Sequence, residues 1–83
     1  MSDQIRSVLD EHGKLLVDVT TLTDRDDLYT AGMTSHASVN VMLALEDTFD
    51  VEFTDQMLRK STFASVSAIR DALAELGVAA SAV

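Results

Sequence analysis

The stretch that decides the fold is residues 35–50, which read SHASVNVMLALEDTFD. An α-helix has about 3.6 residues per turn, so side chains three or four positions apart share a face. With that period, one face of the stretch collects Ser38, Val41, Leu45 and Phe49, with Met42 at its margin. We expect a helix over residues 35–50 that lays this face against the core.

A neighbouring face of the same stretch mixes apolar and acidic side chains. It carries Ser35, His36, Val39, Leu43, Glu46 and Asp50, with Asp47 at its edge. Apolar residues therefore continue beyond the core face. This is typical of a helix that is central in a bundle or that carries a recognition surface.

A helix is also expected over residues 2–12. There Ile5, Val8 and Leu9 recur at helical spacing, and Gly13 follows as a stop. His12 is expected to be a surface or packing residue rather than a functional one.

The polar stretch 14–34 that comes next is rich in Thr and Asp and is long for a loop of a compact domain. We expect it to pack through its apolar side chains and to contain a short turn around residues 24–29. These apolar side chains are Leu15, Leu16, Val17, Leu22, Leu28 and Tyr29.

A short helix is expected after the central one. Residues 51–53 read as an extended connector, and Thr54 is placed to cap a helix that contains Met57 and Leu58, with an acid in its first turn.

The last helix starts near Ser65 and ends at Gly77. Its core side is the series Val66, Ile69, Leu73 and Leu76. The expected fold is therefore all-α: a small four-helix bundle of three main helices and one short helix, with a long first loop.

Length and composition limit the architecture further. Eighty-three residues suit a single domain, 1–83, and we expect an ordered core of about residues 3–77 with a frayed, alanine-rich tail at 78–83. The chain has no cysteine, so a disulfide, a thiolate metal site or a cysteine nucleophile is excluded. No segment resembles a targeting signal or is long enough to span a bilayer, and we expect a cytoplasmic protein.

The charge narrows the class of partner. Fourteen acids against six bases give a net charge of -8. Such a chain is a poor binder of nucleic acid or of an anionic membrane, because both require basic patches. The charge favours a basic protein surface as partner.

Catalytic and metal chemistry have little support. The run at residues 24–27 begins like a calcium loop, but Tyr29 stands where that loop requires glycine. Ser35 and His36 are adjacent, and neighbours on a helix point about 100° apart, so His36 is a poor base for Ser35. The chain is also short for enclosing a substrate pocket of several hundred Å³.

One segment, residues 32–39, does indicate a functional site. Ser35 lies at the junction of the loop with the central helix. Only one of Thr34 and Ser35 is needed as the helix cap, which leaves the other hydroxyl free. The positive end of the helix dipole at this point suits a phosphodiester on the serine oxygen.

These residues give the chain a family resemblance. Gly32-Met33-Thr34-Ser35-His36, the valine three positions later and Leu45-Glu46-Asp47-Thr48-Phe49-Asp50 resemble the G-x-D-S-L motif and following helix of acyl and peptidyl carrier proteins. The resemblance extends from the first helix to about Leu76. It implies a 4′-phosphopantetheine arm on Ser35, whose thiol holds an acyl or aminoacyl group as a thioester, and no catalysis by the chain itself.

The resemblance also implies partners. A phosphopantetheinyl transferase would attach the arm, an ATP-dependent aminoacyl or acyl ligase would load it, and a downstream transferase would unload it, with the chain itself a monomer. The central helix would be the recognition element. The candidate recognition residues are Met33, Thr34, His36, Val39, Leu43, Glu46, Asp47 and Asp50.

The subtype depends on two departures from the motif. Thr34 replaces the usual aspartate and His36 the usual leucine. This resembles stand-alone aminoacyl carriers loaded by seryl-tRNA-synthetase-like ligases, with a small amino acid such as glycine or alanine as cargo. A fatty-acid or polyketide-type carrier, a stand-alone peptidyl carrier and an unmodified acidic interaction module remain alternatives.

Overall fold

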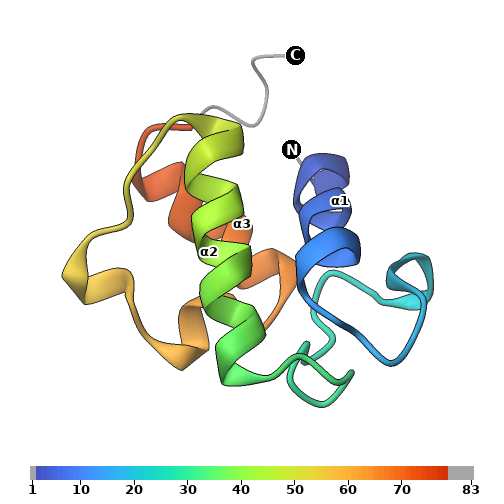
Figure 1. Cartoon of the computed structure of the whole chain (residues 1–83). Coiled ribbons are helices and arrows are strands. Elements are labelled where there is room, and N and C mark those ends of the chain that lie inside the picture. The colour runs from blue at the N-terminus through green and yellow to red at the C-terminus, as the bar shows by residue number, and fades with distance from the viewer. Residues whose placement is uncertain (1, 79–83) are drawn as a thin grey trace.

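Three α-helices and three 3-10 turns form the fold in the computed structural model, which describes residues 2–78 (Figure 1). The elements in chain order are α1 (Ser2–His12), η1 (Val19–Thr21), α2 (Ser35–Phe49), η2 (Asp55–Met57), η3 (Lys60–Phe63) and α3 (Val66–Glu75). The described residues contain no strand, so the all-α class and the three main helices are confirmed. No helix in this range is long and apolar enough to cross a membrane.

The fourth helix differs from the prediction. Where one short helix was expected, the chain forms η2 and η3, two 3-10 turns. Thr54 precedes η2, but its side chain makes no cap hydrogen bond, and Leu58 lies outside the turn. A single 3-10 turn satisfies few backbone groups, so η2 and η3 depend on tertiary contacts rather than on capping.

The ends of the long helices follow the capping signals in the sequence. The Thr34 hydroxyl oxygen accepts a hydrogen bond from the Ala37 N–H at 3.0 Å, and Ser65 does the same for Ala68 at 3.0 Å. At the other end of α2, Asp50 adopts a left-handed backbone with φ of 54°. This residue ends α2 and turns the chain into the connector.

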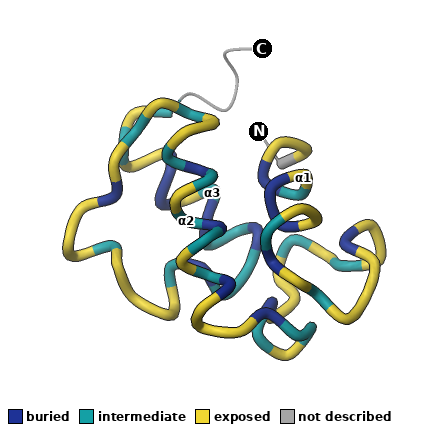
Figure 2. Tube along the Cα trace, in the orientation of Figure 1, coloured by how far each residue is buried: buried dark blue, intermediate teal, exposed yellow. Residues whose placement is uncertain are grey.

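The core lies between the three helices, and Figure 2 shows its buried residues on their facing sides. The buried face of α2 is Ala37, Val41 and Leu45. Ser38 and Phe49, which were predicted to lie on this face, are only half-buried. The face is therefore rotated toward Ala37, whose small side chain gave no signal of its own.

The other helices contribute the residues that the periodicity indicated. The buried set includes Ile5, Val8 and Leu9 of α1 and Val66, Ile69, Ala72 and Leu73 of α3. Phe53 and Phe63 pack edge to face, with ring centroids 5.3 Å apart. This ring pair joins the connector after α2 to η3, and each large side chain so buried stabilises the fold by about 1.5–3 kcal/mol.

The long loop is held by a charged cluster that we call the Arg6 clamp, formed by Arg6, Asp24 and Arg70. The Arg6 guanidinium donates to the carbonyls of Val19 and Leu22, both at 2.8 Å, and to Asp24 at 2.7 Å. The other carboxylate oxygen of Asp24 accepts from Arg70 at 3.1 Å. The hydrogen bond from Arg6, and then that from Arg70, lowers the pKa of Asp24 below its ordinary value. Asp24 thus ties the loop to α1 and α3, and the described residues hold no group of three metal-ligating side chains.

The apolar anchors of the loop were only partly predicted. Leu28 is buried as expected, and Val19, which was not predicted, is buried too. Leu16 is 86% exposed and Val17 is 46% exposed, so their prediction as anchors was wrong. The Leu16 N–H donates to the Ala31 carbonyl at 2.9 Å, which holds this exposed leucine in place.

The predicted frayed tail lies mostly outside the described residues. Val78 is the exception, because it is half-buried against the core and its N–H donates to the Leu73 carbonyl at 3.0 Å. Fraying of the tail stays a prediction.

Candidate functional site

The candidate site is built around Ser35, the first residue of α2. Because Thr34 caps the helix, the Ser35 side chain is not needed for that role. Ser35 is exposed, and within residues 2–78 its hydroxyl makes no recorded hydrogen bond. The prediction that one of the two hydroxyls caps and the other stays free is confirmed.

The position of Ser35 also gives it a favourable field for an anion. Its backbone lies in the first turn of a 15-residue helix, where free N–H groups concentrate partial positive charge. The first turn of α2 contains no acidic residue. A phosphate group attached at this oxygen would therefore lie at the positive end of the helix without a neighbouring carboxylate in that turn.

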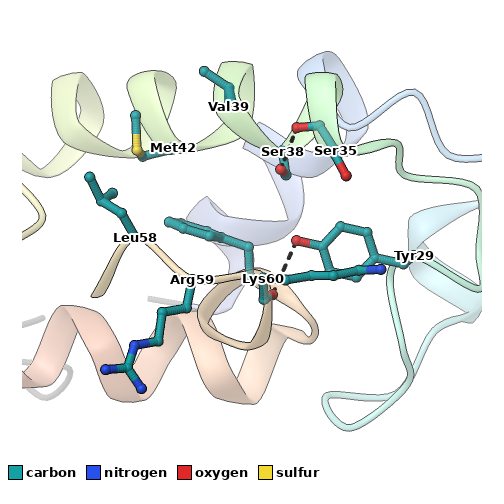
Figure 3. A pocket seen from close by; sticks show the side chains of 9 residues that line it. Tyr29, Ser35, Ser38, Val39, Met42, Leu58, Arg59 and Lys60 are labelled. Atoms are coloured by element: carbon teal, nitrogen blue, oxygen red, sulfur yellow. Dashed lines mark hydrogen bonds between the residues drawn. The ribbon is translucent and has the colours of Figure 1, made fainter. Parts of the chain in front are cut away.

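A groove of about 380 Å³ opens beside Ser35, between α2 and the η2–η3 segment (Figure 3). Its lining residues are Tyr29, Ser35, Ser38, Val39, Met42, Leu58, Arg59, Lys60 and Phe63. This groove is open to the surface, so it does not contradict the expectation that so short a chain is poorly suited to enclosing a substrate pocket of this size.

A cation is held at the rim of this groove. The Lys60 ammonium lies 4.8 Å from the centroid of the Tyr29 ring, and the Tyr29 hydroxyl donates to the Lys60 carbonyl at 3.1 Å. The two residues are separated by 31 positions in the chain, so no local pattern could predict this pair.

The apolar recognition candidates on α2 are accessible. Val39 is 49% exposed and Leu43 is 53% exposed, and both lie on the helix that begins with Ser35. The exposed polar candidates are Thr34, His36, Asp47 and Asp50. The α2 face therefore presents two apolar side chains bordered by polar and acidic ones.

Two candidates lie elsewhere than predicted. Met33 is only 2% exposed and belongs to the core, so its prediction as a surface recognition residue was wrong. Glu46 is half-buried, and its carboxylate accepts the Phe53 N–H at 2.9 Å. Glu46 thus helps to hold the connector after α2, a structural task that the sequence did not indicate.

A second hollow, of about 510 Å³, lies between α1 and α2. It is lined by Val8, Glu11, His12, Asn40, Leu43, Ala44, Asp47 and Thr48. His12 and Glu11 lie 3.6 Å apart, a pair that is ionic only when the imidazole is protonated. Leu43 and Asp47, two of the recognition candidates, line this hollow on the side of α2 that faces α1.

Comparison with known proteins places this geometry in a family. Residues 12–73 match the family model described as a phosphopantetheine attachment site. The chain is 46% identical over 71 residues to an aminoacyl carrier protein of Agrobacterium fabrum, an alignment that covers 86% of each protein.

Solved structures agree with this assignment. A chain in the crystal structure of an engineered Bradyrhizobium japonicum glycine:[carrier protein] ligase complexed with a carrier protein from Agrobacterium tumefaciens and AMP matches with a TM-score of 0.87. The identity is 44%, and the match covers 89% of this chain and 99% of the other. A solution structure from Agrobacterium tumefaciens matches with a TM-score of 0.72 and 44% identity, over 90% of both chains. The protein belongs to the phosphopantetheine-attachment family of non-catalytic carrier proteins.

Proposed function

We propose that this protein is an aminoacyl carrier whose 4′-phosphopantetheine arm is attached through the Ser35 oxygen. The arm's terminal thiol holds a small amino acid, glycine or alanine, as a thioester. The observation that carries the proposal is the free, exposed hydroxyl of Ser35 at the start of α2, next to a threonine that has taken over the capping role.

The residues around Ser35 fit such a group. Attachment forms a bond between the Ser35 oxygen and the β-phosphorus of coenzyme A, breaks the pyrophosphate bond and releases adenosine 3′,5′-bisphosphate. The serine proton passes to a base of the transferase. The helix N-terminus and the absence of an acid in the first turn suit the charge of the resulting phosphodiester. When bound, the arm supplies the thiol that this cysteine-free chain lacks.

The α2 face supports the proposed partners. Val39 and Leu43 offer apolar contacts, and Asp47 and Asp50 offer charges to a basic surface. The complex of the relative with a glycine:[carrier protein] ligase supports an ATP-dependent amino acid ligase as the loading partner. A phosphopantetheinyl transferase and a downstream transferase complete the set, and we expect a monomer that works in the cytoplasm.

Intact mass tests the attachment. The apo-protein is incubated with coenzyme A and a broad-specificity phosphopantetheinyl transferase, alongside the Ser35→Ala and Ser38→Ala variants. Ser38 is the matched control because it lies one helical turn away and lines the same groove. We expect one added phosphopantetheine in the wild type and in Ser38→Ala, and none in Ser35→Ala. No addition with several transferases, or addition to Ser35→Ala, would overturn the proposal.

A further inference from the structure

Four of the six basic residues of the chain fall into two groups. Arg6 and Arg70 are bound to Asp24 in the Arg6 clamp. Arg59 and Lys60 line the groove that Ser35 also lines. Within residues 2–78 neither of these two forms an ion pair with a carboxylate. In Figure 3 the Arg59 guanidinium points away from Ser35, which leaves Lys60 as the unpaired cation of this rim that can complement an anion.

Of the two, Lys60 is the one that the fold holds in place. Its ammonium is attracted to the face of the Tyr29 ring, and its backbone carbonyl accepts the Tyr29 hydroxyl. The Leu28 N–H donates to the Ala64 carbonyl at 2.7 Å, which joins the loop of Tyr29 to the end of η3. The side chain of Lys60 has therefore already lost part of the conformational freedom that an ion pair would remove.

Figure 3 shows that Ser35 and the Tyr29–Lys60 pair lie on opposite sides of one opening. The rest of the lining is largely apolar and includes Val39, Met42 and Phe63. An occupant that suits this groove has a negative charge at the end near Ser35 and a less polar body that follows the wall.

We propose that Lys60, held over Tyr29, binds the phosphodiester of the arm and fixes the direction in which the arm leaves α2. This inference rests on the proposed attachment of the arm at Ser35. Lys60 is thus a positioning residue for the prosthetic group. Arg59 shares the rim but has no aromatic ring recorded beneath it in the described chain, and is the matched control.

The test compares apo- and holo-protein by NMR at low ionic strength. It follows the side-chain resonances of Lys60 and Tyr29, the phosphorus resonance, and the relaxation of the two arm amides, with the arm labelled through isotopically labelled coenzyme A. We expect attachment to shift the Lys60 and Tyr29 resonances. Lys60→Gln should lower the population of the ordered arm roughly two- to fivefold, the range of an exposed ion pair. Lys60→Arg should restore part of it, and Arg59→Gln should leave it unchanged.

The outcomes separate this inference from the proposed function. An arm attached at Ser35 with unchanged Lys60 and Tyr29 resonances, and the same arm relaxation in Lys60→Gln, would overturn the role of Lys60 and leave the carrier function intact. Groove resonances that shift only when the ligase is added, and equally in apo- and holo-protein, would assign the groove to the partner and also overturn it. Failure of attachment would remove both proposals.

Discussion

The Arg6 clamp and the rim of the Ser35 groove both contain two basic side chains, but these side chains have different partners in the two regions. In the clamp, Arg6 and Arg70 both donate to the Asp24 carboxylate, and Arg6 also donates to two loop carbonyls, so both guanidiniums are paired within the fold. At the rim, Lys60 rests on an aromatic ring and Arg59 lines the groove beside it, with no carboxylate paired to either in residues 2–78. A basic side chain that is held in place without a carboxylate partner is available to a ligand. A basic side chain that is paired with a carboxylate stabilises the fold instead.

The largest effect on stability is expected from the clamp. Arg6→Met keeps the aliphatic stem but removes three hydrogen bonds; it leaves the Leu22 carbonyl without its donor and the Val19 carbonyl with only the Leu22 N–H at 3.3 Å. The free energy of unfolding should fall by about 2–3 kcal/mol, measured by urea denaturation. Arg59→Met is the matched control and should change it by less than about 0.5 kcal/mol. Equal losses in the two variants would show that the contrast between the regions is wrong.

Acid should weaken the same clamp. The hydrogen bonds from Arg6 and Arg70 lower the pKa of Asp24, so the folded state holds its charged form more strongly than the unfolded state does. The resulting stability is complete above the unfolded value of about 4 and disappears as the pH falls through the lower, folded value.

Urea denaturation of the wild type and of Asp24→Asn between neutral pH and about pH 3 measures this contribution. The wild type should be the more stable at neutral pH, and the gap should narrow below about pH 4. The pKa of Asp18 is also lowered, by hydrogen bonds from Thr20. Because Asp18 contributes equally in both proteins, the difference between the wild type and Asp24→Asn isolates Asp24. A gap that stays constant across this range would contradict the role given to the Asp24 charge.

A smaller effect is expected from the exposed face of α2 that carries Val39, Leu43, Asp47 and Asp50. Asp47 is exposed on α2 and, unlike Glu46, makes no hydrogen bond within residues 2–78 that holds the fold. Asp47→Lys should lower kcat/KM of the loading ligase roughly two- to fivefold and weaken its dependence on salt. Asp71→Lys, on α3, makes the same charge change at another exposed site and should leave loading unchanged. Equal effects would mean that only net charge matters.

The smallest effect is that of Lys60→Gln on stability. Only the contact with the Tyr29 ring is lost, since the hydrogen bond to the Lys60 carbonyl does not involve the side chain. The free energy of unfolding should change by less than about 1 kcal/mol. A loss as large as that of Arg6→Met would identify Lys60 as a second structural clamp.

The sequence was sufficient where local rules decide the structure. Thr34 and Ser65 marked the starts of α2 and α3 because a hydroxyl before an apolar periodic run satisfies free N–H groups. The free hydroxyl of Ser35 followed from the same argument. By contrast, Met33 stands alone between Gly32 and Thr34, outside any periodic run, so nothing local indicated that it is buried.

Contacts between distant residues could not be predicted in this way. Arg6 and Asp24 are 18 positions apart, and Tyr29 and Lys60 are 31 apart. In both pairs an ordinary charged residue gains its role only when the helices are assembled. One of these contacts defines the Arg6 clamp and the other defines the rim of the Ser35 groove. The sequence therefore predicted Ser35, whose role follows from local rules, but not the Tyr29–Lys60 pair beside it.

Loading of the holo-protein tests the central claim most directly. The phosphopantetheinylated wild type is incubated with a glycine:[carrier protein] ligase, ATP and glycine or alanine, and its intact mass is measured before and after hydroxylamine treatment. We predict one added aminoacyl group that hydroxylamine releases, as expected for a thioester, and none on apo-protein or on Ser35→Ala. Aminoacylation of the apo-protein, or loading with fatty acyl groups and no amino acid, would contradict the account.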